Sequence, residues 1–509
     1  MDLLDYFIIG MDSALSLSNL WYCFVGVLLG TLVGVLPGIG ALATIALLLP
    51  VTFHLDATNA IVMLAGVYYG STYGGSTASI LLNLPGTPSS AVACLDGYPM
   101  AQQGRAGIAL FMTTIASFFG ATVGIIILML FSPSIAEIAL KFGAPEYFAM
   151  MLLGLIAAST ISTGSPLKGI AMVVLGVLVG VIGTDVNSGM ARFSFGFPEL
   201  TDGISLVAIA MGLFGIAEVI ASVNRVRRGQ VDRKSITFRS MIPTREDWKR
   251  SWMPMVRGST IGSFFGALPG TGGTIASFMS YAVEKRVSKT PSRFGKGAVE
   301  GITGPEASNN ACDQTAFIPT LTLGIPGTVS MALMLGALMI HGITPGPQLM
   351  LEKPDLFWGL IMSFWIGNIM LLVLNIPLIG VWVRLLAVPY HLLYPAVMVL
   401  VCIGVFSINN STFDVWIVAI FGTVGYVMRL LDFPPAPLLL GYVLGPLMEE
   451  NVRRALLISR GDFMVFLERP ISATFITITV VLLLWAIASS LRRPGKSSVL
   501  ATAASGSSD

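Results

Sequence analysis

The sequence predicts an all-α membrane protein that crosses the bilayer many times, and three observations support this fold class. The 509 residues are 54% hydrophobic and only 11% charged, whereas a soluble domain carries about 25% charged residues. The mean hydropathy is +0.82, and many apolar stretches reach the roughly 20 residues that span a bilayer core. Glycine and proline are abundant, with 55 and 28 residues, which predicts that several membrane helices are broken. Together these values exclude a soluble enzyme.

The chain contains an internal duplication. Residues 30–40 (GTLVGVLPGIG) align without gaps with residues 262–272 (GSFFGALPGTG), at an offset of 232. A second pair, residues 80–87 (ILLNLPGT) and 321–328 (LTLGIPGT), follows at an offset of 241. Each half therefore carries a Leu-Pro-Gly break followed by a second break at Pro-Gly-Thr.

The duplication and the charge pattern divide the chain into five parts. We expect a first transmembrane repeat over residues 1–224, a basic cytoplasmic connector over 225–257 and a second repeat over 258–450. A linker with an extra membrane helix over 451–497 and a disordered tail over 498–509 complete the chain. The connector holds 10 of the 29 Lys and Arg residues, and such basic loops stay on the cytoplasmic side. The apolar stretches predict about 10–12 spans besides the C-terminal helix.

The apolar segment 258–283 lies between two basic stretches, which favours a re-entrant hairpin that returns to the side where it entered. In the first half we count about five crossings after the equivalent hairpin. An odd number of crossings turns the second copy over relative to the first. The sequence thus predicts inverted-topology repeats with re-entrant or broken helices, an architecture that recurs among secondary transporters.

Two polar clusters accompany the Pro-Gly-Thr breaks. Residues 68–92 are dense in Ser, Thr and Gly, and residues 304–332 carry Glu, Asn, Asp, Gln and Thr side chains. Polar groups in lipid are costly, so both clusters should face the bundle interior or a watery cavity. Small residues also allow close helix packing, and this alternative stands for any single Ser or Thr. The matched positions of the two clusters in the two repeats favour a binding site.

The breaks suggest which chemistry this site performs. A helix that starts after a break presents free N–H groups and the positive end of its dipole, and two such ends near the midplane would bind an anion. Unwound carbonyls with Asn and Asp side chains nearby suit coupling to Na⁺ or H⁺. The candidate substrate-binding residues are Gly38, Ser76, Thr77, Ser79, Asn83, Gly86, Thr87, Gly270, Gly272, Thr320, Gly327 and Thr328. The candidate coupling-ion ligands are Ser308, Asn309, Asn310 and Asp313.

Patterns for other chemistry are missing from the sequence. It contains no GxxxxGK[ST] loop for ATP, and its four cysteines and three histidines show no zinc-site spacing. Nor does it contain a soluble basic domain for nucleic acid. We therefore predict no enzyme activity, no catalytic residue, no metal site and no cofactor besides the coupling ion, which is Na⁺ or H⁺.

Five stretches of the sequence resemble the TctA family, the large membrane subunit of tripartite tricarboxylate transporters. These are residues 30–40, 73–107, 294–311, 317–328 and 337–350. They include DGYPMAQQG and PEASNNA, which are long enough to be specific. The resemblance extends over almost the whole chain, from about Leu20 to Arg493.

The resemblance implies a multi-pass importer of the bacterial inner membrane. Its substrates would be tricarboxylates and dicarboxylates such as citrate, with uptake driven by Na⁺ or H⁺. Its partners would be a small four-helix membrane subunit of the TctB type and a periplasmic solute-binding protein of the TctC type. A passive channel, or a membrane scaffold subunit without ion-coupled transport, stays as the alternative. The site residues come from the sequence pattern and not from the resemblance.

Overall fold

The computed structural model describes residues 3–36, 40–161, 165–185, 188–222, 238–268, 271–386 and 390–491. Within these ranges the chain is almost entirely helical, so the predicted all-α membrane fold is confirmed. The described residues contain one pair of strands, β1 (Gly183–Thr184) and β2 (Ala191–Arg192), which are antiparallel. Gly38, Gly270, residues 225–237 of the predicted connector and the predicted tail lie outside the described residues.

Helices follow one another along both halves of the chain. The first half contains α1 (Leu3–Ala14), α2 (Leu17–Val35), α3 (Gly40–Thr52), α4 (Ala57–Leu82), η1 (Pro88–Ser90), α5 (Ala91–Met100), η2 (Ala101–Arg105), α6 (Ala106–Ala139), α7 (Ala144–Ile161), α8 (Pro166–Gly180), η3 (Pro198–Leu200), α9 (Leu206–Ala210), η4 (Met211–Ile216) and α10 (Ala217–Ser222). The second half contains η6 (Phe238–Met241), α11 (Arg245–Gly266), α12 (Gly272–Val287), η7 (Pro291–Arg293), α13 (Glu300–Thr315), α14 (Phe317–Leu323), α15 (Val329–Ile340), α16 (Leu349–Glu352), α17 (Pro354–Asn375), α18 (Ile379–Leu385), α19 (Tyr390–Asn409), α20 (Thr412–Leu430), α21 (Pro435–Ile458), α22 (Val465–Glu468) and α23 (Pro470–Leu491).

Length and composition make the chain a multi-pass membrane protein. Five helical stretches of the described residues are long and apolar enough to cross a bilayer: Leu17–Val35, Pro88–Ala139, Pro354–Asn375, Thr412–Leu430 and Pro470–Ala488. Shorter apolar helices, such as α3, α8 and α15, accompany them. The last span lies within α23, where we predicted the extra C-terminal helix.

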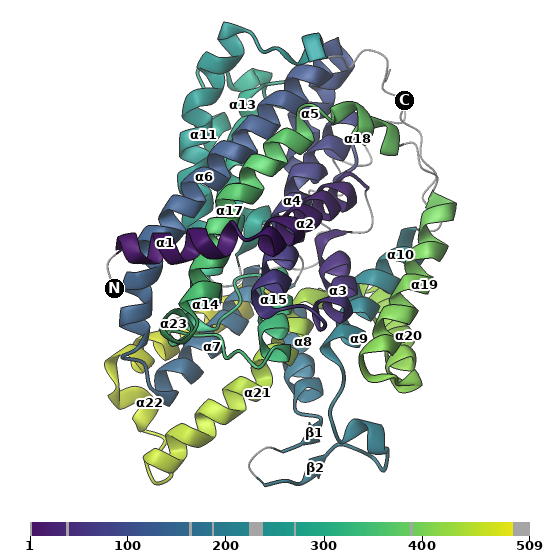
Figure 1. Cartoon of the computed structure of the whole chain (residues 1–509). Coiled ribbons are helices and arrows are strands. Elements are labelled where there is room, and N and C mark those ends of the chain that lie inside the picture. Colours follow the sequence, from purple (N-terminus) through teal and green to yellow (C-terminus); the bar gives the residue numbers. More distant parts are fainter. Residues whose placement is uncertain are drawn as a thin grey trace.

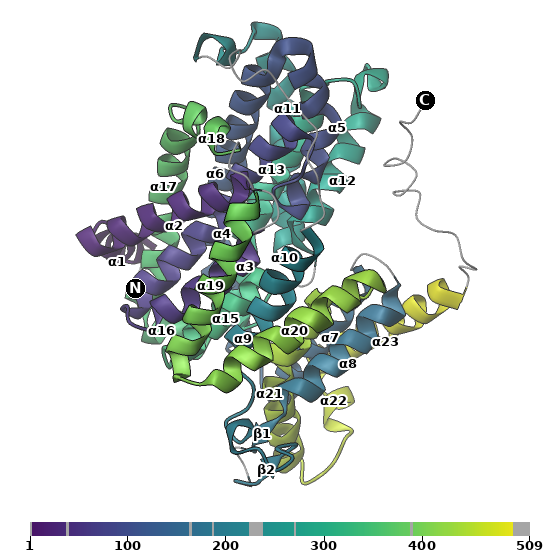
Figure 2. The same ribbon diagram turned by 90° about the vertical axis from the view of Figure 1, so that its right-hand side faces the viewer.

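The helices form two groups (Figures 1 and 2). Both views place α5, α11 and α13 at one end of the molecule, and α7, α8, α21 and α23 at the other. The long helix α6 runs along α13, and α17 packs against α1, α2, α4 and α6. The polar helix α13 is thus enclosed by its neighbours.

The two halves repeat each other in packing as well as in sequence. In each half, the helix before the Leu-Pro-Gly break crosses a second helix through three glycines, where an added Cβ atom would collide with the facing backbone. The pairs are α2 with α4 in the first half and α11 with α13 in the second. The contacts are Gly26 with Met63, Gly30 with Val67 and Gly34 with Ser71 in the first half, and Gly258 with Gly304, Gly262 with Ser308 and Gly266 with Cys312 in the second. The glycines are offset by 232 and their partners by 241, the offsets of the sequence motifs. The inverted orientation of the repeats in the membrane stays a prediction.

The helices also end alike before the Pro-Gly-Thr breaks. Asn83 follows α4 with φ 55°, and Gly324 follows α14 with φ 69°. Both lie in the left-handed region that glycine and asparagine tolerate best. The two breaks are therefore the same structural device in two copies.

Each half of the chain contributes helices that pack against helices of the other half. Helix α6 of the first half packs along α13 of the second, and α17 of the second half packs on α4 of the first. Likewise α3 contacts α15, and α12 contacts η1. The polar centre is therefore built jointly by both halves.

Two predicted boundaries differ from the structure. Helix α11 begins at Arg245, inside the predicted connector, because Thr244 and Asp247 cap it reciprocally: Thr244 Oγ1 accepts from Asp247 N at 3.2 Å, and Asp247 Oδ2 accepts from Thr244 N at 3.0 Å. Arg250 and Arg257 of this helix form ion pairs with Glu300 and Glu284, so their charge does not indicate a loop. Helix α21 continues to Ile458, beyond residue 450 where we expected the second repeat to end.

Candidate functional site

The candidate site is centred on α13, whose sequence EGITGPEASNNACDQT is one of the least apolar in the protein. Every residue of this helix is buried, between α6, α11 and α12 and against α4. Burial of so many polar side chains inside a membrane protein is costly unless they bind something or each other. Their individual partners therefore indicate what the site does.

The first part of the site lies at the start of α12. Gly272 opens this helix with φ 68°, and the hydroxyl of Thr271 donates to the carbonyl oxygens of Phe265 and Leu268 instead of capping the helix. The first N–H groups of α12 are thus free of any side-chain cap. Asn309 of α13 lies against Gly273, and neither polar atom of its fully buried amide has a hydrogen-bond partner among the described residues.

Residues with hydroxyl groups from both Pro-Gly-Thr breaks lie close to the start of α12. A Cβ atom at Gly273 would lie 3.5 Å from Ser89 Cβ, and Ser89 Oγ lies 3.2 Å from Thr87 Oγ1. A Cβ atom at Gly272 would lie 3.6 Å from Thr328 Cγ2. The structure thus brings together four predicted substrate and ion residues: Thr87, Gly272, Thr328 and Asn309.

This first group offers hydrogen-bond donors and no fixed charge. Uncapped N–H groups, the amide of Asn309 and nearby hydroxyls are the groups that hold carboxylates at helix starts. None of the ion pairs among the described residues involves a side chain of this group. The group can therefore bind a small anion through dipoles.

Several predicted substrate residues instead hold helices together. Ser79 donates to Gly75 O at 3.0 Å and to Ser90 Oγ at 3.1 Å. Thr320 donates to Ala316 O, one turn back on its own helix, at 2.7 Å. Gly86 allows close packing, since a Cβ atom there would collide with the carbonyl oxygen of Gly34.

The remaining predicted substrate residues take varied positions. Ser76 is buried beside Glu306, and its Oγ has no hydrogen-bond partner within the described ranges. Thr77 and Gly327 are buried near the breaks. Asn83 is exposed at the end of α4.

The predicted coupling-ion ligands divide between two sides of α13. Asn309 faces α12, as described above. Asn310 faces α4 and α6: its Nδ2 donates to Ser117 Oγ at 2.8 Å and to Glu306 O at 3.0 Å, and its Oδ1 accepts from Thr72 at 3.4 Å. Asp313 lies beside the hydroxyls of Tyr68 and Thr72 on α4.

Ser308, the fourth predicted ligand, lies where α11 crosses α13. Its backbone carbonyl is covered by Gly262, and its Oγ has no partner in the described part of the chain. Asn309 thus belongs with the substrate group, whereas Asn310 and Asp313 form a second polar group.

We did not assign a role to Glu306 or Ser117, yet both belong to this second group. Glu306 is 2% exposed, and Ser117 Oγ lies 3.4 Å from its Oε2. The spacing of Glu306, Asn310 and Asp313 along α13 places the three on one face of a helix, a signal that the sequence does contain. Ser117 is one of several hydroxyl residues in the largely apolar helix α6, and nothing in the sequence distinguishes it from the others.

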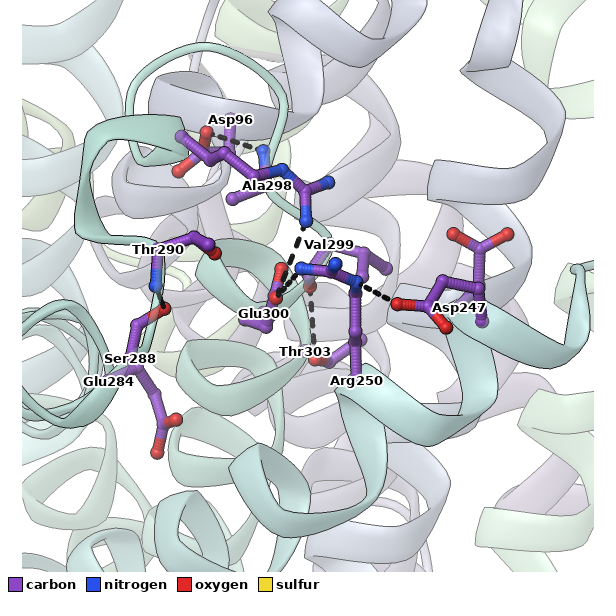
Figure 3. A network of polar contacts seen from close by, with 12 residues as sticks. Asp96, Asp247, Arg250, Glu284, Ser288, Thr290, Ala298, Val299, Glu300 and Thr303 are labelled. Carbon is purple, nitrogen blue, oxygen red and sulfur yellow. Dashed lines mark hydrogen bonds and ion pairs between the residues drawn. The ribbon is translucent and has the colours of Figure 1, made fainter.

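The first turn of α13 forms a different polar region (Figure 3). Figure 3 shows Arg250 of α11 and Glu300 pointing toward each other, with Nη1 and Oε1 3.1 Å apart. Asp96 of α5, within the DGYPMAQQG stretch, accepts from the N–H groups of Gly297 and Ala298, both at 2.8 Å, and from the hydroxyl of Tyr281 at 3.0 Å. This carboxylate, from the other half of the chain, thereby fixes the backbone just before α13.

Apolar helices enclosing a jointly built polar centre define a membrane transport protein. The chain belongs to the tripartite tricarboxylate transporter TctA family, whose model matches residues 20–440. It is therefore a subunit of a transporter and not an enzyme.

Two relatives come from Agrobacterium vitis. The chain is 49% identical over 492 residues to the "Uncharacterized 52.8 kDa protein in TAR-I ttuC′ 3′region", an alignment that covers 97% of this chain and 98% of the relative. It is 53% identical over 231 residues to the "Uncharacterized protein in TAR-II ttuC′ 3′region", covering 45% of this chain and 96% of that relative. No solved structure matches the chain.

Proposed function

We propose that this protein is the permease subunit of an importer for tricarboxylates and dicarboxylates such as citrate, driven by a Na⁺ or H⁺ gradient. The observation that carries the proposal is Asn309, a fully buried amide with two unpartnered atoms against the uncapped start of α12. Family membership supports the substrate class.

The proposal includes the other parts of the transporter. A small four-helix membrane subunit of the TctB type and a periplasmic solute-binding protein of the TctC type would assemble with the chain in the bacterial inner membrane. Membership in a tripartite transporter family supports both partners. The soluble protein delivers the carboxylate, and the permease carries it across.

In the bound state, the substrate carboxylate accepts hydrogen bonds from the first N–H groups of α12 and from the amide of Asn309. Thr87, Ser89 and Thr328 surround it with hydroxyls. Because these donors carry no net charge, the bound anion still adds negative charge to the protein interior. A coupling cation then lowers the cost of holding that charge in a medium of low dielectric constant.

Uptake of labelled citrate into proteoliposomes tests this function. The vesicles would contain this chain and its small membrane partner, with the binding protein outside and a Na⁺ or pH gradient imposed in separate runs. We expect accumulation under one gradient only, and a panel of dicarboxylates would identify the preferred substrate. Asn309→Ala should abolish uptake at normal expression, whereas Asn451→Ala, whose amide bonds only to Leu447 O of its own helix, should not.

The alternatives give other results in the same assay. A passive channel would equilibrate the substrate without accumulation against a gradient. A scaffold subunit would tolerate Asn309→Ala and Thr328→Ala alike.

A further inference from the structure

Buried carboxylates in this protein fall into two kinds. Most accept from a cationic side chain, from backbone N–H groups or from an amide: Asp96, Glu146, Asp185, Asp247, Glu284, Glu300 and Asp414. Glu306 and Asp313, at 2% and 3% exposed, have no such donor within the described residues. The Oδ2 atom of Asp313 has no hydrogen-bond partner there at all.

We propose that Glu306 and Asp313 together form the seat of the coupling cation, a monovalent ion that is either Na⁺ or a proton. The inference rests on the proposed function and deepens it, because it assigns the ion to one side of α13 and the substrate to the other. Two buried carboxylates without a counter-charge are unfavourable in a membrane interior. A bound cation removes that penalty.

A continuous chain of polar groups joins the two acids. Glu306 Oε2 lies 3.4 Å from Ser117 Oγ, which accepts from Asn310 Nδ2 at 2.8 Å. Asn310 Oδ1 accepts from Thr72 at 3.4 Å, and Thr72 lies beside Asp313. Hydroxyl and amide oxygens next to carboxylates are the ligands that Na⁺ and protons use inside transporters.

The groups that face these acids cannot neutralise them. Tyr73 of α4 and Cys94 of α5 lie near Glu306. Tyr68 of α4 and Cys312 of α13 lie near Asp313. None of these side chains carries a positive charge in either protonation state, so the compensating charge has to come from outside the protein.

The seat adjoins the substrate group through Tyr68. This side chain lies beside both Asp313 and Thr328, and Thr328 contacts the start of α12. An empty seat would repel an incoming carboxylate, and a filled seat would not. Cation binding thus precedes or accompanies substrate binding, which is the requirement for coupled transport.

The position of the seat in the duplication supports a shared role. Thr72 and Asp313 are separated by 241 positions, the offset of the second motif. They are therefore equivalent residues of the two repeats, and equivalent residues touch only near the axis that relates the repeats. Such repeat interfaces hold the coupling ions of other secondary transporters.

Neutral variants test the seat. Glu306→Gln and Asp313→Asn keep size and hydrogen bonding but mimic a permanently neutral acid. In proteoliposomes we expect gradient-driven accumulation to fall about tenfold or more, while exchange of labelled for unlabelled substrate across the same membrane persists. Glu300→Gln, a neutral variant of a paired acid on the same helix, should accumulate and exchange like the wild type.

Radioactive Na⁺ uptake and a pH-sensitive dye, each measured with substrate present, identify the ion. Glu306→Gln should abolish whichever cation flux the wild type shows. Wild-type accumulation by both variants would overturn the seat, as would loss of exchange in well-folded variants, because the acids would then belong to the substrate site. Failure of the wild-type protein to accumulate any carboxylate would instead overturn the proposed function, and the seat with it. Glu306→Asp, which keeps the charge, should retain coupling in part.

Discussion

Helix α13 holds buried carboxylates at its first turn and further along, and their partners on the neighbouring helices differ. Glu300 at the first turn accepts from Arg250 at 3.1 Å, with Arg293 a further 3.8 Å contact. Glu306 and Asp313, two and four turns along, have no cation near them among the described residues. On one helix, the carboxylate of the first turn thus forms a structural ion pair, whereas the two carboxylates further along are uncompensated charges.

The difference follows from the helices that face each position of α13. At the first turn, α11 presents the long side chain of Arg250. Further along, α11 presents Gly258, Gly262 and Gly266, where a Cβ atom would already collide with the backbone of α13. So close an approach leaves no room for an arginine or lysine on that face of α13. Glu306 and Asp313 lie on another face, toward α4 and α6, where Tyr68, Tyr73 and Ser117 offer hydroxyl groups and no positive charge.

Blocking this close approach should have the largest effect. Leu in place of Gly262 would collide with the carbonyl oxygen of Ser308 and force α11 from α13, at a cost of about 3 kcal/mol or more. We expect almost no folded Gly262→Leu protein in a size-exclusion profile of the detergent extract. Thr260→Leu, at an exposed position of α11, should give the wild-type profile. A normal profile for Gly262→Leu would show that close packing does not hold the centre together.

Removing the carboxylate of Asp96 should have the next largest effect on stability. Asp96→Ala leaves the buried N–H groups of Gly297 and Ala298 without their acceptor, which costs about 3 kcal/mol. The thermal unfolding midpoint in detergent should fall accordingly. Asp202→Ala, at an exposed acid, serves as the control. Equal midpoints for the two variants would show that the hydrogen bonds of Asp96 to Gly297 and Ala298 do not stabilise the fold.

Neutralising the paired acid sharpens the comparison within α13. Glu300→Gln removes the partner of Arg250, whose side chain is 31% exposed, so we expect a loss of only about 1 kcal/mol. The same unfolding midpoint measures it. Arg250→Gln should lower the midpoint by a similar amount, and the double variant by less than the sum, if the two side chains act as a pair.

Neutralising the unpaired acid should have the smallest effect on stability and the opposite sign. Glu306→Gln removes a buried charge that has no compensating charge among the described residues. The free energy of unfolding should therefore increase by less than about 1 kcal/mol, and the unfolding midpoint should rise accordingly. A fall as large as that of Glu300→Gln would mean that Glu306 has a partner in the folded protein.

Much of this architecture follows from the sequence, because it depends on local patterns. The Leu-Pro-Gly and Pro-Gly-Thr motifs predict the helix breaks, and their two offsets predict the repeated crossings of α2 with α4 and of α11 with α13. The sequence also predicts that Thr87, Asn309 and Thr328 approach one another.

Other features depend on which face of a helix meets which neighbour, and a linear pattern does not settle this. Asn309 and Asn310 are adjacent in sequence and face opposite partners, so they belong to different groups. Ser117 lies in an apolar helix, and only the packing of α6 on α13 reveals its role. The basic stretch 245–257 resembles a loop in sequence, because the partners Glu300 and Glu284 of Arg250 and Arg257 are distant along the chain.

The burial of α13 also has a consequence for synthesis in the cell. This helix is not among those apolar enough to cross a membrane by composition, so it gains little by leaving the translocation machinery for lipid on its own. The helices that receive its polar face, α4 and α6, belong to the first half and are made earlier. The N-terminal half therefore acts as the template on which this weakly hydrophobic helix of the C-terminal half is inserted.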